Sequence, residues 1–401
     1  MKIALIGLYY EYNLGDPLLF DCVEYALREI DPTIEVEKID FFGRIDKKNE
    51  ITRNAGIPIV YFVVRALRKI VKILGGTSII LEEWVWKTSR EEKRLKKFFQ
   101  NKMRQAKYDG IIIMGAGTLK YDVRLNFAPY YKVIVETANE LHIPVYINCV
   151  GVESKYNAND RRCLQFSKCL SNDVIKMITT RDDIETLNKY VKNPLIKTWK
   201  IADVGVWAAE TFGIEKQSEA EYIGLGMITP ERFREFGRMD TYNRYEETWL
   251  EIIEELEKTH RKWKIFNNGD ICDQEFANRI CQQVGKNPEE YVLTPTSPQE
   301  LVQVIRGFKG IITSRLHSCI VAYSLNIPFI AISWNNKLRY FAQEIQVSER
   351  VIESDELMKE VILEKFENAL VQGYDNKKRE EFRNTSKEAI RKYILSMQEE
   401  K

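Results

Sequence analysis

The chain has 401 residues, which is long enough for two domains that each bury a hydrophobic core. Its 60 Lys and Arg residues balance 59 Asp and Glu residues, so no overall positive field favours nucleic acid, and we expect no nucleic-acid partner. Seven cysteines without CxxC spacing argue against a zinc site and a disulfide framework, and they fit a reducing cytoplasm.

The first predicted elements are a strand over 2–7 and a helix over 17–30. The apolar strand is too short for the core of a signal peptide, so we expect a cytoplasmic protein. Asp16 as N-cap and Pro17 in the first turn predict where the helix begins. No uninterrupted apolar stretch reaches the ~18–20 residues that a membrane span requires.

Strand-like and helical segments alternate through the first half of the chain. Further strands are predicted over 34–42, 110–115, 144–150 and 174–180. Helices are predicted between them over 57–74, 89–107, 128–142 and 159–171. This alternation predicts βαβ units and a parallel sheet.

The same pattern restarts at residue 222. Strands are predicted over 222–228, 262–266, 310–313 and 328–333, and helices over 245–258, 273–284, 298–307 and 316–325. Ser297 and Pro298 form a strong helix start. The polar stretch 211–220 marks the expected boundary between two doubly wound α/β domains, residues 1–212 and 213–375. Residues 376–401 contain a charged helix that we expect to pack back on the first domain.

The stretch Ser314-Arg315-Leu316-His317-Ser318 carries the clearest chemical signal. It joins an apolar strand to an apolar helix, and Ser314 stands where the N-cap belongs. A helix N-terminus offers free backbone N–H groups to an anion, and Arg315 adds a planar cation. His317, one of only three histidines, can move a proton near neutral pH. The stretch predicts an anionic substrate to which a proton is transferred.

Two other cations are predicted at strand ends. Lys337 follows the strand over 328–333, with Asn335 as a helix cap, and Arg181 follows the strand over 174–180, with Asp182 as a possible cap. Ligands of open parallel sheets bind outside the carboxyl ends of the strands. We therefore expect these cations to contribute to an anion site.

The motifs in chain order resemble the polysaccharide pyruvyl transferase family. The resemblance rests on Asn13-Leu14-Gly15-Asp16, Gly115-Ala116-Gly117 with Asp122, Thr180-Arg181-Asp182, Ser314-Arg315-Leu316-His317-Ser318, the strand at Pro328, and Lys337. It implies a GT-B-like fold of two Rossmann-like domains. It also implies transfer of enolpyruvate from phosphoenolpyruvate to a sugar of a surface polysaccharide or its lipid-linked precursor, which forms a ketal and releases phosphate.

The resemblance further implies roles for individual residues. His317 would be the general acid–base. The implied donor-binding residues are Arg181, Ser314, Arg315, Leu316 and Lys337, and the implied acceptor-binding residues are Asn13, Gly15, Asp16, Gly115, Gly117 and Asp122. Phosphoenolpyruvate would be a co-substrate and no cofactor is expected. No metal site is expected either, because no His, Asp and Glu cluster has ligand spacing.

Two other functions stay open at this stage. A GT-B glycosyltransferase would share the fold and use basic residues to bind the diphosphate of a nucleotide sugar. A non-catalytic sugar-binding protein could also retain the fold. Binding of phosphoenolpyruvate, of a nucleotide sugar or of neither would discriminate the three.

Residues 57–107 combine apolar and basic residues at helical spacing. Such helices can lie on an anionic membrane surface, where lipid-linked acceptors would be found. The same pattern is also typical of helices that pack against a core and expose a solvated basic face. Both interpretations of this segment stay open.

Overall fold

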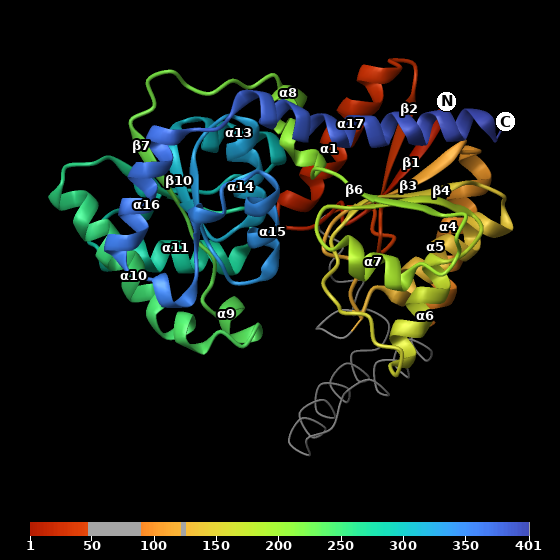
Figure 1. Cartoon of the computed structure of the whole chain (residues 1–401), viewed down its shortest axis with the longest axis horizontal. Helices are drawn as coiled ribbons and strands as arrows, with labels where there is room; N and C mark the ends of the chain where they lie inside the picture. The colour runs from red at the N-terminus through yellow and green to blue at the C-terminus, as the bar shows by residue number, and fades with distance from the viewer. Residues whose placement is uncertain (47–89, 122–125, 401) are drawn as a thin grey trace. The chain divides into compact units, whose positions relative to one another are not determined.

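The computed structural model describes residues 1–46, 90–121 and 126–400 (Figure 1). These residues form two compact units. Unit 1 contains Met1–Tyr10, Thr33–Trp199 and Met397–Lys401, and unit 2 contains Glu11–Pro32 and Lys200–Ser396. Each unit is an α/β unit built around its own parallel sheet.

The units differ in two ways from the expected domains 1–212 and 213–375. The chain passes from unit 1 to unit 2 after Trp199, because the next helices, η2 (Val204–Trp207) and α8 (Ala208–Phe212), pack on α14 (Leu316–Ser324). The segment Glu11–Pro32, which includes α1 (Gly15–Ile30), also belongs to unit 2.

Within the described residues, the sheet of unit 1 has six strands in the order β2-β1-β3-β4-β5-β6. Their bounds are β1 Lys2–Gly7, β2 Glu35–Asp40, β3 Gly110–Met114, β4 Val145–Val150, β5 Ile175–Thr180 and β6 Lys197–Lys200. The strand order reverses direction between β1 and β3. Their carboxyl ends are therefore an expected ligand site.

Helices of unit 1 cover one face of this sheet. They are α4 (Glu91–Ala106), α5 (Ala128–Glu140), α6 (Arg161–Leu170) and α7 (Ile184–Tyr190), and each packs on the next. The core between helices and sheet is largely apolar, with Phe99, Tyr131 and Phe166 from the helices against isoleucines of the strands.

In unit 2 the described residues form a second six-stranded sheet in the order β12-β11-β10-β7-β8-β9. Their bounds are β7 Tyr222–Gly226, β8 Trp263–Phe266, β9 Val292–Leu293, β10 Phe308–Thr313, β11 Phe329–Ile332 and β12 Val351–Ile352. The paired strands run parallel. Here the order reverses between β7 and β10, which is again where ligands of doubly wound sheets bind.

Helices lie on both sides of the second sheet (Figure 1). On one side, Tyr245 and Trp249 of α10 (Met239–Lys258) and Phe366 of α16 (Lys359–Gln372) pack on Ile223, Leu225 and other strand residues. The remaining bounds are α9 Glu231–Glu235, α11 Ile271–Gln283, α12 Pro288–Tyr291, α13 Pro298–Arg306, α15 Asn336–Glu344, η3 Ser348–Arg350, η4 Ser354–Glu356 and α17 Asn376–Glu399. The α/β class and the two doubly wound sheets are as the sequence predicted.

Helix starts show where local signals decide the structure and where they do not. Ser297 caps α13 through Glu300 N, and Pro298 is its first residue, as predicted. The prediction for Asp16 is wrong, because α1 begins at Gly15, two residues before the predicted start at Pro17, with Leu14 at the N-cap. Asp183 rather than Asp182 caps α7.

The terminal helix α17 groups with unit 2 up to Ser396, and the chain from Met397 groups with unit 1. In unit 2, the indole of Trp207 donates to Arg383 O, and the Arg383 guanidinium stacks on its ring at 4.0 Å. In unit 1, the Met397 side chain lies against Gly110, which has no side chain of its own.

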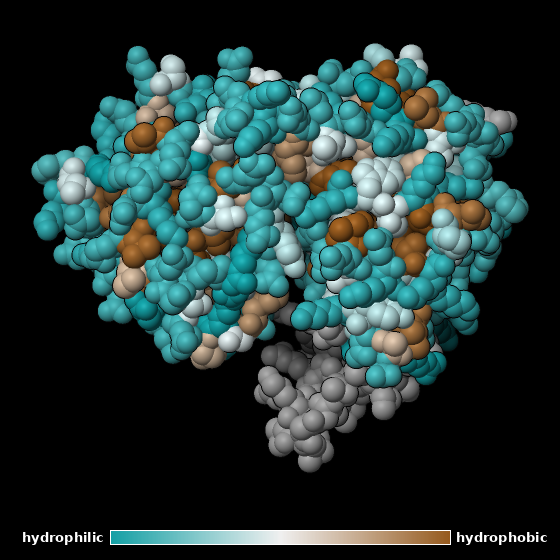
Figure 2. Space-filling view, in the orientation of Figure 1, coloured by the Kyte–Doolittle hydropathy of each residue, from teal (hydrophilic) through white to brown (hydrophobic). Residues whose placement is uncertain are grey.

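Hydrophilic residues predominate on the face of the molecule that Figure 2 shows. Among the described helices, none has both the length and the apolarity needed to cross a bilayer. Most of the basic segment 57–107 lies outside the described residues, which include only its end, α4.

Candidate functional site

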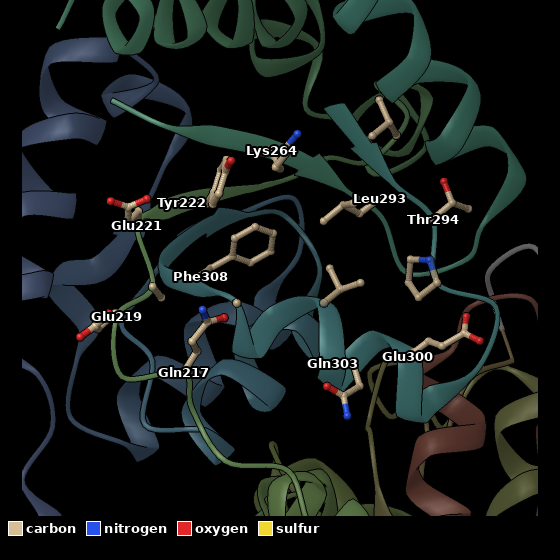
Figure 3. A pocket seen from close by; sticks show the side chains of 15 residues that line it. Gln217, Glu219, Glu221, Tyr222, Lys264, Leu293, Thr294, Glu300, Gln303 and Phe308 are labelled. Carbon is tan, nitrogen blue, oxygen red and sulfur yellow. The ribbon is translucent and has the colours of Figure 1, made fainter. Parts of the chain in front are cut away.

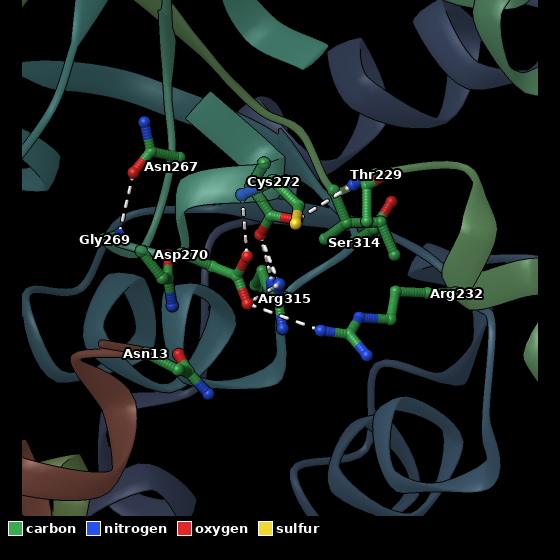
Figure 4. Close-up of polar contacts among 12 residues, drawn as sticks. Asn13, Thr229, Arg232, Asn267, Gly269, Asp270, Cys272, Ser314 and Arg315 are labelled. Atoms are coloured by element: carbon green, nitrogen blue, oxygen red, sulfur yellow. Dashed lines mark hydrogen bonds and ion pairs between the residues drawn. The ribbon is translucent and has the colours of Figure 1, made fainter. Parts of the chain in front are cut away.

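The carboxyl ends of four strands of unit 2 bring polar side chains together (Figure 4). Thr229 follows β7, Asn267 to Asp270 follow β8, and Ser314 and Arg315 follow β10. Trp334 and Asn335 follow β11. This is the sheet edge at which ligands of doubly wound folds bind, so these residues form the candidate site of unit 2.

Arg315 is fixed by two carboxylates. Its Nε lies 2.7 Å from Asp273 Oδ2, its Nη2 also contacts that oxygen, and Asp270 Oδ2 is 3.5 Å from Nη2. Arg315 is 8% exposed and Asp273 is fully buried. Arg232 approaches Asp270 from the solvent side at 3.4 Å. The guanidinium predicted to bind an anion is therefore held in a buried ion pair.

Burial raises the pKa of the Asp273 carboxyl, and the Arg315 guanidinium opposes that shift. Burial also acts to lower the pKa of Arg315, but the Asp273 and Asp270 carboxylates outweigh it and raise the pKa above its usual value. Arg315 is therefore charged at every pH at which the protein is folded, and its charge is largely offset by its partners.

Ser314 does not cap α14, contrary to the prediction, because the helix begins at Leu316 with Arg315 at the N-cap. The buried Ser314 hydroxyl instead lies 2.8 Å from the Tyr245 hydroxyl, and its carbonyl accepts a hydrogen bond from Trp334 Nε1 at 2.7 Å. Burial raises the pKa of Tyr245 to about 12, so this hydroxyl stays protonated. Ser314 thus links α10, β10 and the loop after β11.

His317, the second residue of α14, lies against the first residue of α1. The imidazole is 7% exposed. A Cβ atom built on Gly15 would fall 1.9 Å from its Nδ1. Both residues were predicted to be functional, one for proton transfer and one for the acceptor, and the structure places them in direct contact within unit 2.

Asn268 joins the loop before α1 to α14. Its carbonyl accepts from Leu14 N at 2.8 Å, and its Oδ1 accepts from the Ser318 hydroxyl at 2.6 Å. Gly269 beside it has φ +87°, and a Cβ there would fall 2.5 Å from Tyr12 O. The loop over 12–14 is therefore packed tightly on the loop after β8.

Two amide groups of this site have unused hydrogen-bonding capacity. Among the described residues, Asn13 Oδ1 and Asn268 Nδ2 are buried and have no hydrogen-bond partner. Asn13 Nδ2 lies 3.5 Å from Asp16 Oδ2, so its other end is occupied. A buried polar atom without a partner costs about 1–3 kcal/mol. Such atoms often mark a place where a ligand or water completes the bonding.

The remaining predicted residues of unit 2 lie at helix starts. Leu316 is the first residue of α14, whose N-terminal N–H groups face the strand ends. Lys337 lies in the first turn of α15, and its amide donates to the capping Asn335 Oδ1 at 3.1 Å, as the sequence predicted. Positive ends of two helices thus lie at this sheet edge.

The predicted residues of unit 1 lie at the ends of β3 and β5. A Cβ on Gly115 would fall 2.3 Å from Cys149 O, so backbone approaches backbone there. Cys149 itself has φ +58°. The Gly151 amide donates to Ala116 O at 2.8 Å, and a Cβ on Gly151 would meet the Gly117 backbone at 3.3 Å. At the ends of β3 and β4, main-chain atoms therefore pack directly against one another.

Arg181 lies at the carboxyl end of β5 and is 8% exposed. Its Nη2 would lie 3.3 Å from a Cβ on Gly151, which places the guanidinium beside the glycine-rich loops. Asp182 accepts hydrogen bonds from Val152 N at 2.9 Å and from the Thr180 hydroxyl at 3.0 Å, and these bonds connect the end of β5 to the loop after β4. Asp122 lies outside the described residues.

Metal ligation has no candidate among the residues that the structure describes, since no three His, Cys, Asp or Glu side chains cluster suitably. Among its described residues, unit 2 also contains a hollow of about 690 Å³ (Figure 3). Tyr222 and Phe308, the first residues of β7 and β10, line it. It therefore lies at the opposite strand ends from His317.

Three contributors to the site were missed or undervalued from the sequence. They are Asp273, Tyr245 and Asn268, which are not among the site residues predicted above. Asp273 lies in the first turn of α11, directly after a strand end, and an acid there was the available signal. Tyr245 gave none, because only packing brings α10 to Ser314.

The fold of this chain is similar to those of several sugar-nucleotide enzymes and glycosyltransferases. UDP-GlcNAc 2-epimerase from Methanocaldococcus jannaschii is similar in structure, with TM-score 0.59, 14% identity and 99% of each chain covered. A putative UDP-N-acetylglucosamine 2-epimerase from Listeria monocytogenes gives TM-score 0.58, 13% identity and coverage of 100% of this chain and 97% of that one. The glycosyltransferase SnogD from Streptomyces nogalater gives 0.51, 11% and 99% of each chain.

At these identities the structural similarity establishes the GT-B fold of two Rossmann-like units and nothing finer. No curated protein sequence matches the chain. A family model described as polysaccharide pyruvyl transferase matches residues 13–336, a range that begins at Asn13 and ends one residue before Lys337. Because that match covers most of the sequence, the chain belongs to the polysaccharide pyruvyl transferase family.

Proposed function

We propose that this transferase moves enolpyruvate from phosphoenolpyruvate to two hydroxyls of one sugar, forming a pyruvate ketal and releasing phosphate. Membership of the family supports the reaction class. The observation that carries the proposal is the placement of His317 in the first turn of α14, two residues after Arg315 and at the strand ends of unit 2. A proton-transferring group beside helix N-termini suits an anionic enol ester.

In the proposed reaction, His317 gives a proton to the methylene carbon, which becomes a methyl group. The neighbouring carbon becomes cationic, and a sugar hydroxyl forms a bond to it while its proton returns to His317. The bond between this carbon and the phosphate oxygen then breaks, and a second hydroxyl of the sugar closes the ketal. Its proton leaves with phosphate, so protons balance. Proton transfer of this kind typically contributes ~10²–10⁴-fold.

We assign donor binding to the N-terminus of α14 and to Lys337 in α15. The donor role of Arg181, which lies in unit 1, stays a proposal that the resemblance supports. Arg315 contributes in this proposal mainly by fixing the strand-end geometry, because its Nε and Nη2 already contact Asp273. Asn268 Nδ2 supplies an unused donor for a phosphate or carboxylate oxygen. The acceptor roles of Asn13, Asp16, Gly115, Gly117 and Asp122 remain proposals that the resemblance supports.

Calorimetry and product analysis test the function. Wild-type protein should bind phosphoenolpyruvate and, with a suitable acceptor, release phosphate and increase the acceptor mass by a ketal-linked pyruvate. His317→Ala should retain donor binding and lose turnover. Binding of UDP-GlcNAc without any binding of phosphoenolpyruvate would favour a nucleotide-sugar enzyme instead. Binding of neither would favour a sugar-binding protein.

We further propose that the acceptor is met at the cytoplasmic face of a membrane, through residues 57–107. In α4, Leu95, Phe99 and Met103 face the core, while Lys93, Lys97 and Arg104 are exposed. Salt-sensitive sedimentation with anionic liposomes, lost when the three exposed cations become Glu, is the expected result. Equal sedimentation with neutral liposomes would reject the membrane role.

Some of the basic side chains of α4 already form ion pairs with acidic residues of unit 1. Lys96 contacts Glu140 at 2.6 Å, and Lys102 contacts Glu37 at 2.7 Å. These ion pairs fit the alternative that the helix packs on unit 1 and simply exposes a solvated face. Lys96→Glu is therefore a matched control that should affect liposome binding least.

A further inference from the structure

Gly15 lies so close to His317 that no larger residue fits between α1 and the imidazole. A Cβ atom built on Gly15 would fall 1.9 Å from His317 Nδ1, 2.3 Å from Cγ and 2.6 Å from Cβ. Carbon atoms in ordinary contact are about 3.5–4.0 Å apart. Any side chain at this position would displace either the ring or the start of the helix.

The conformation of the backbone does not account for this glycine. Gly15 is the first residue of a regular helix and is not among the glycines with positive φ. Alanine is favoured over glycine at such positions, because glycine loses more conformational freedom on folding. The contact with His317 is what requires a residue without a side chain.

Hydrogen bonds hold both sides of this contact in place. The Leu14 amide donates to Asn268 O at 2.8 Å and fixes the loop that ends at Gly15. The Ser318 hydroxyl donates to Asn268 Oδ1 at 2.6 Å and fixes the turn of α14 that carries His317. One residue, Asn268, thus anchors both sides of the contact, and all three anchoring residues are almost fully buried.

We infer that Gly15 is a positioning residue for His317, which leaves Nε2 as the nitrogen that exchanges protons with the substrate. The three atoms nearest to a Cβ built on Gly15 are His317 Nδ1, Cγ and Cβ, so this position faces the side of the ring away from Nε2. The Nε2 proton passes to the methylene carbon of phosphoenolpyruvate, and Nε2 then takes the proton of the attacking sugar hydroxyl. This inference rests on the proposed function.

The role differs from the acceptor contact that the family resemblance implied for Gly15. Because Gly15 has no side chain, the first turn of α1 packs directly on the imidazole and restricts the ring to one orientation. A ring misplaced by about 1 Å can lower the reaction rate ~10²-fold. Gly15→Ala should therefore lower kcat by roughly a hundredfold or more. Binding of phosphoenolpyruvate should change much less.

Gly307→Ala is the matched control. Gly307 also lies in unit 2, and a Cβ there would meet only Val304 O at 3.5 Å and Gln217 Oε1 at 3.9 Å. This variant should keep wild-type kcat. A Gly15→Ala enzyme that is folded and as active as the control would overturn the inference.

Histidine NMR reports the ring directly, because the chain has only three histidines. In ¹⁵N-histidine-labelled protein, phosphoenolpyruvate should shift the Nε2 signal of His317. Gly15→Ala should displace the His317 ring signals before ligand is added, while the exposed His142 and His260 keep theirs. Unchanged His317 signals in a folded Gly15→Ala protein would also overturn the inference.

A double variant covers the case in which Gly15→Ala folds poorly. His317→Gly removes all three atoms that the new Cβ would meet, so Gly15→Ala should lower Tm far less in that background than in wild type. An equal decrease in both backgrounds would show that the steric conflict is not with His317. Failure of wild-type protein to use phosphoenolpyruvate, with His317 signals still displaced by Gly15→Ala, would reject the proposed function and support the contact.

Discussion

The two units share one fold but finish their strand ends differently. In unit 1, the ends of β3 and β4 meet backbone to backbone: Gly115 packs on the Cys149 carbonyl, and Gly151 bonds to Ala116 O. In unit 2, side chains fill the same edge, where Arg315 is held by Asp273 and Ser318 by Asn268. The comparison shows that equivalent sheet edges can be built for different tasks, because the fold fixes the edge but not what occupies it.

The difference also predicts how each edge responds to mutation. A network of buried charges loses stability when one partner is removed, because the other charge is left buried without a counter-charge. A close contact between glycine and main-chain atoms is instead disrupted when a substitution adds a side chain.

Arg315→Met should lower the free energy of unfolding by about 3–5 kcal/mol, because Asp273 would remain buried without its cation. Urea unfolding monitored by circular dichroism measures the loss. Arg279→Met is the control, since Arg279 contacts Glu246 at 2.8 Å with its side chain 54% exposed. Exposed pairs contribute about 0–1 kcal/mol. Equal losses in both variants would show that the unit 2 edge is not a buried charge network.

Gly115→Ala should lower the free energy of unfolding by about 1–3 kcal/mol, the usual cost of overpacking. The added Cβ would fall 2.3 Å from Cys149 O and 2.5 Å from Asn148 O, and neither main-chain atom can rotate away. Thermal unfolding beside Gly307→Ala gives the comparison. If both substitutions are tolerated alike, the backbone closure of unit 1 is looser than described.

Asn268→Ala should weaken phosphoenolpyruvate binding about tenfold, or about 1.4 kcal/mol, if the unused Nδ2 donates to the ligand. The neighbouring Asn267 is a matched control, because its Oδ1 accepts from Gly269 N and its Nδ2 lies 3.5 Å from Thr294 Oγ1. Asn267→Ala should leave donor affinity nearly unchanged in titration calorimetry. The opposite ranking would remove Asn268 from the ligand site.

Glu353→Gln should have the smallest effect, at most about 1 kcal/mol at neutral pH. Burial raises the pKa of this carboxyl, but Arg339 and Arg238 outweigh it and hold the pKa below its usual value. A carboxyl with a lowered folded-state pKa stabilises above its unfolded pKa and loses that contribution as pH falls. The wild-type advantage should therefore be present at pH 7 and disappear near pH 3.

Constant stability differences between pH 7 and pH 3 would contradict that assignment. The side chains of Glu353 and Arg339 are 30% and 39% exposed, so added salt should also reduce the advantage at pH 7. The buried Arg315 pair should respond to salt much less.

The sequence predicted most elements because apolar periodicity and local caps decide them. Ser297 and Pro298 begin a helix wherever the chain places them. Asp16 was expected to cap α1, yet α1 begins at Gly15, because the contact with His317 and the Leu14 bond to Asn268 set the helix start. Tertiary contacts overrode a local signal there.

The site shows the same division. The sequence by itself determined that Arg315, His317 and Lys337 would stand at the carboxyl ends of parallel strands, because strand-to-helix connections are read along the chain. Only the tertiary structure decided that Glu11–Pro32 would join unit 2, that Asp273 would pair with Arg315, and that Gly15 would pack against the His317 imidazole. Such pairings join segments far apart in sequence, and their energy depends on distance and burial, which no local pattern encodes.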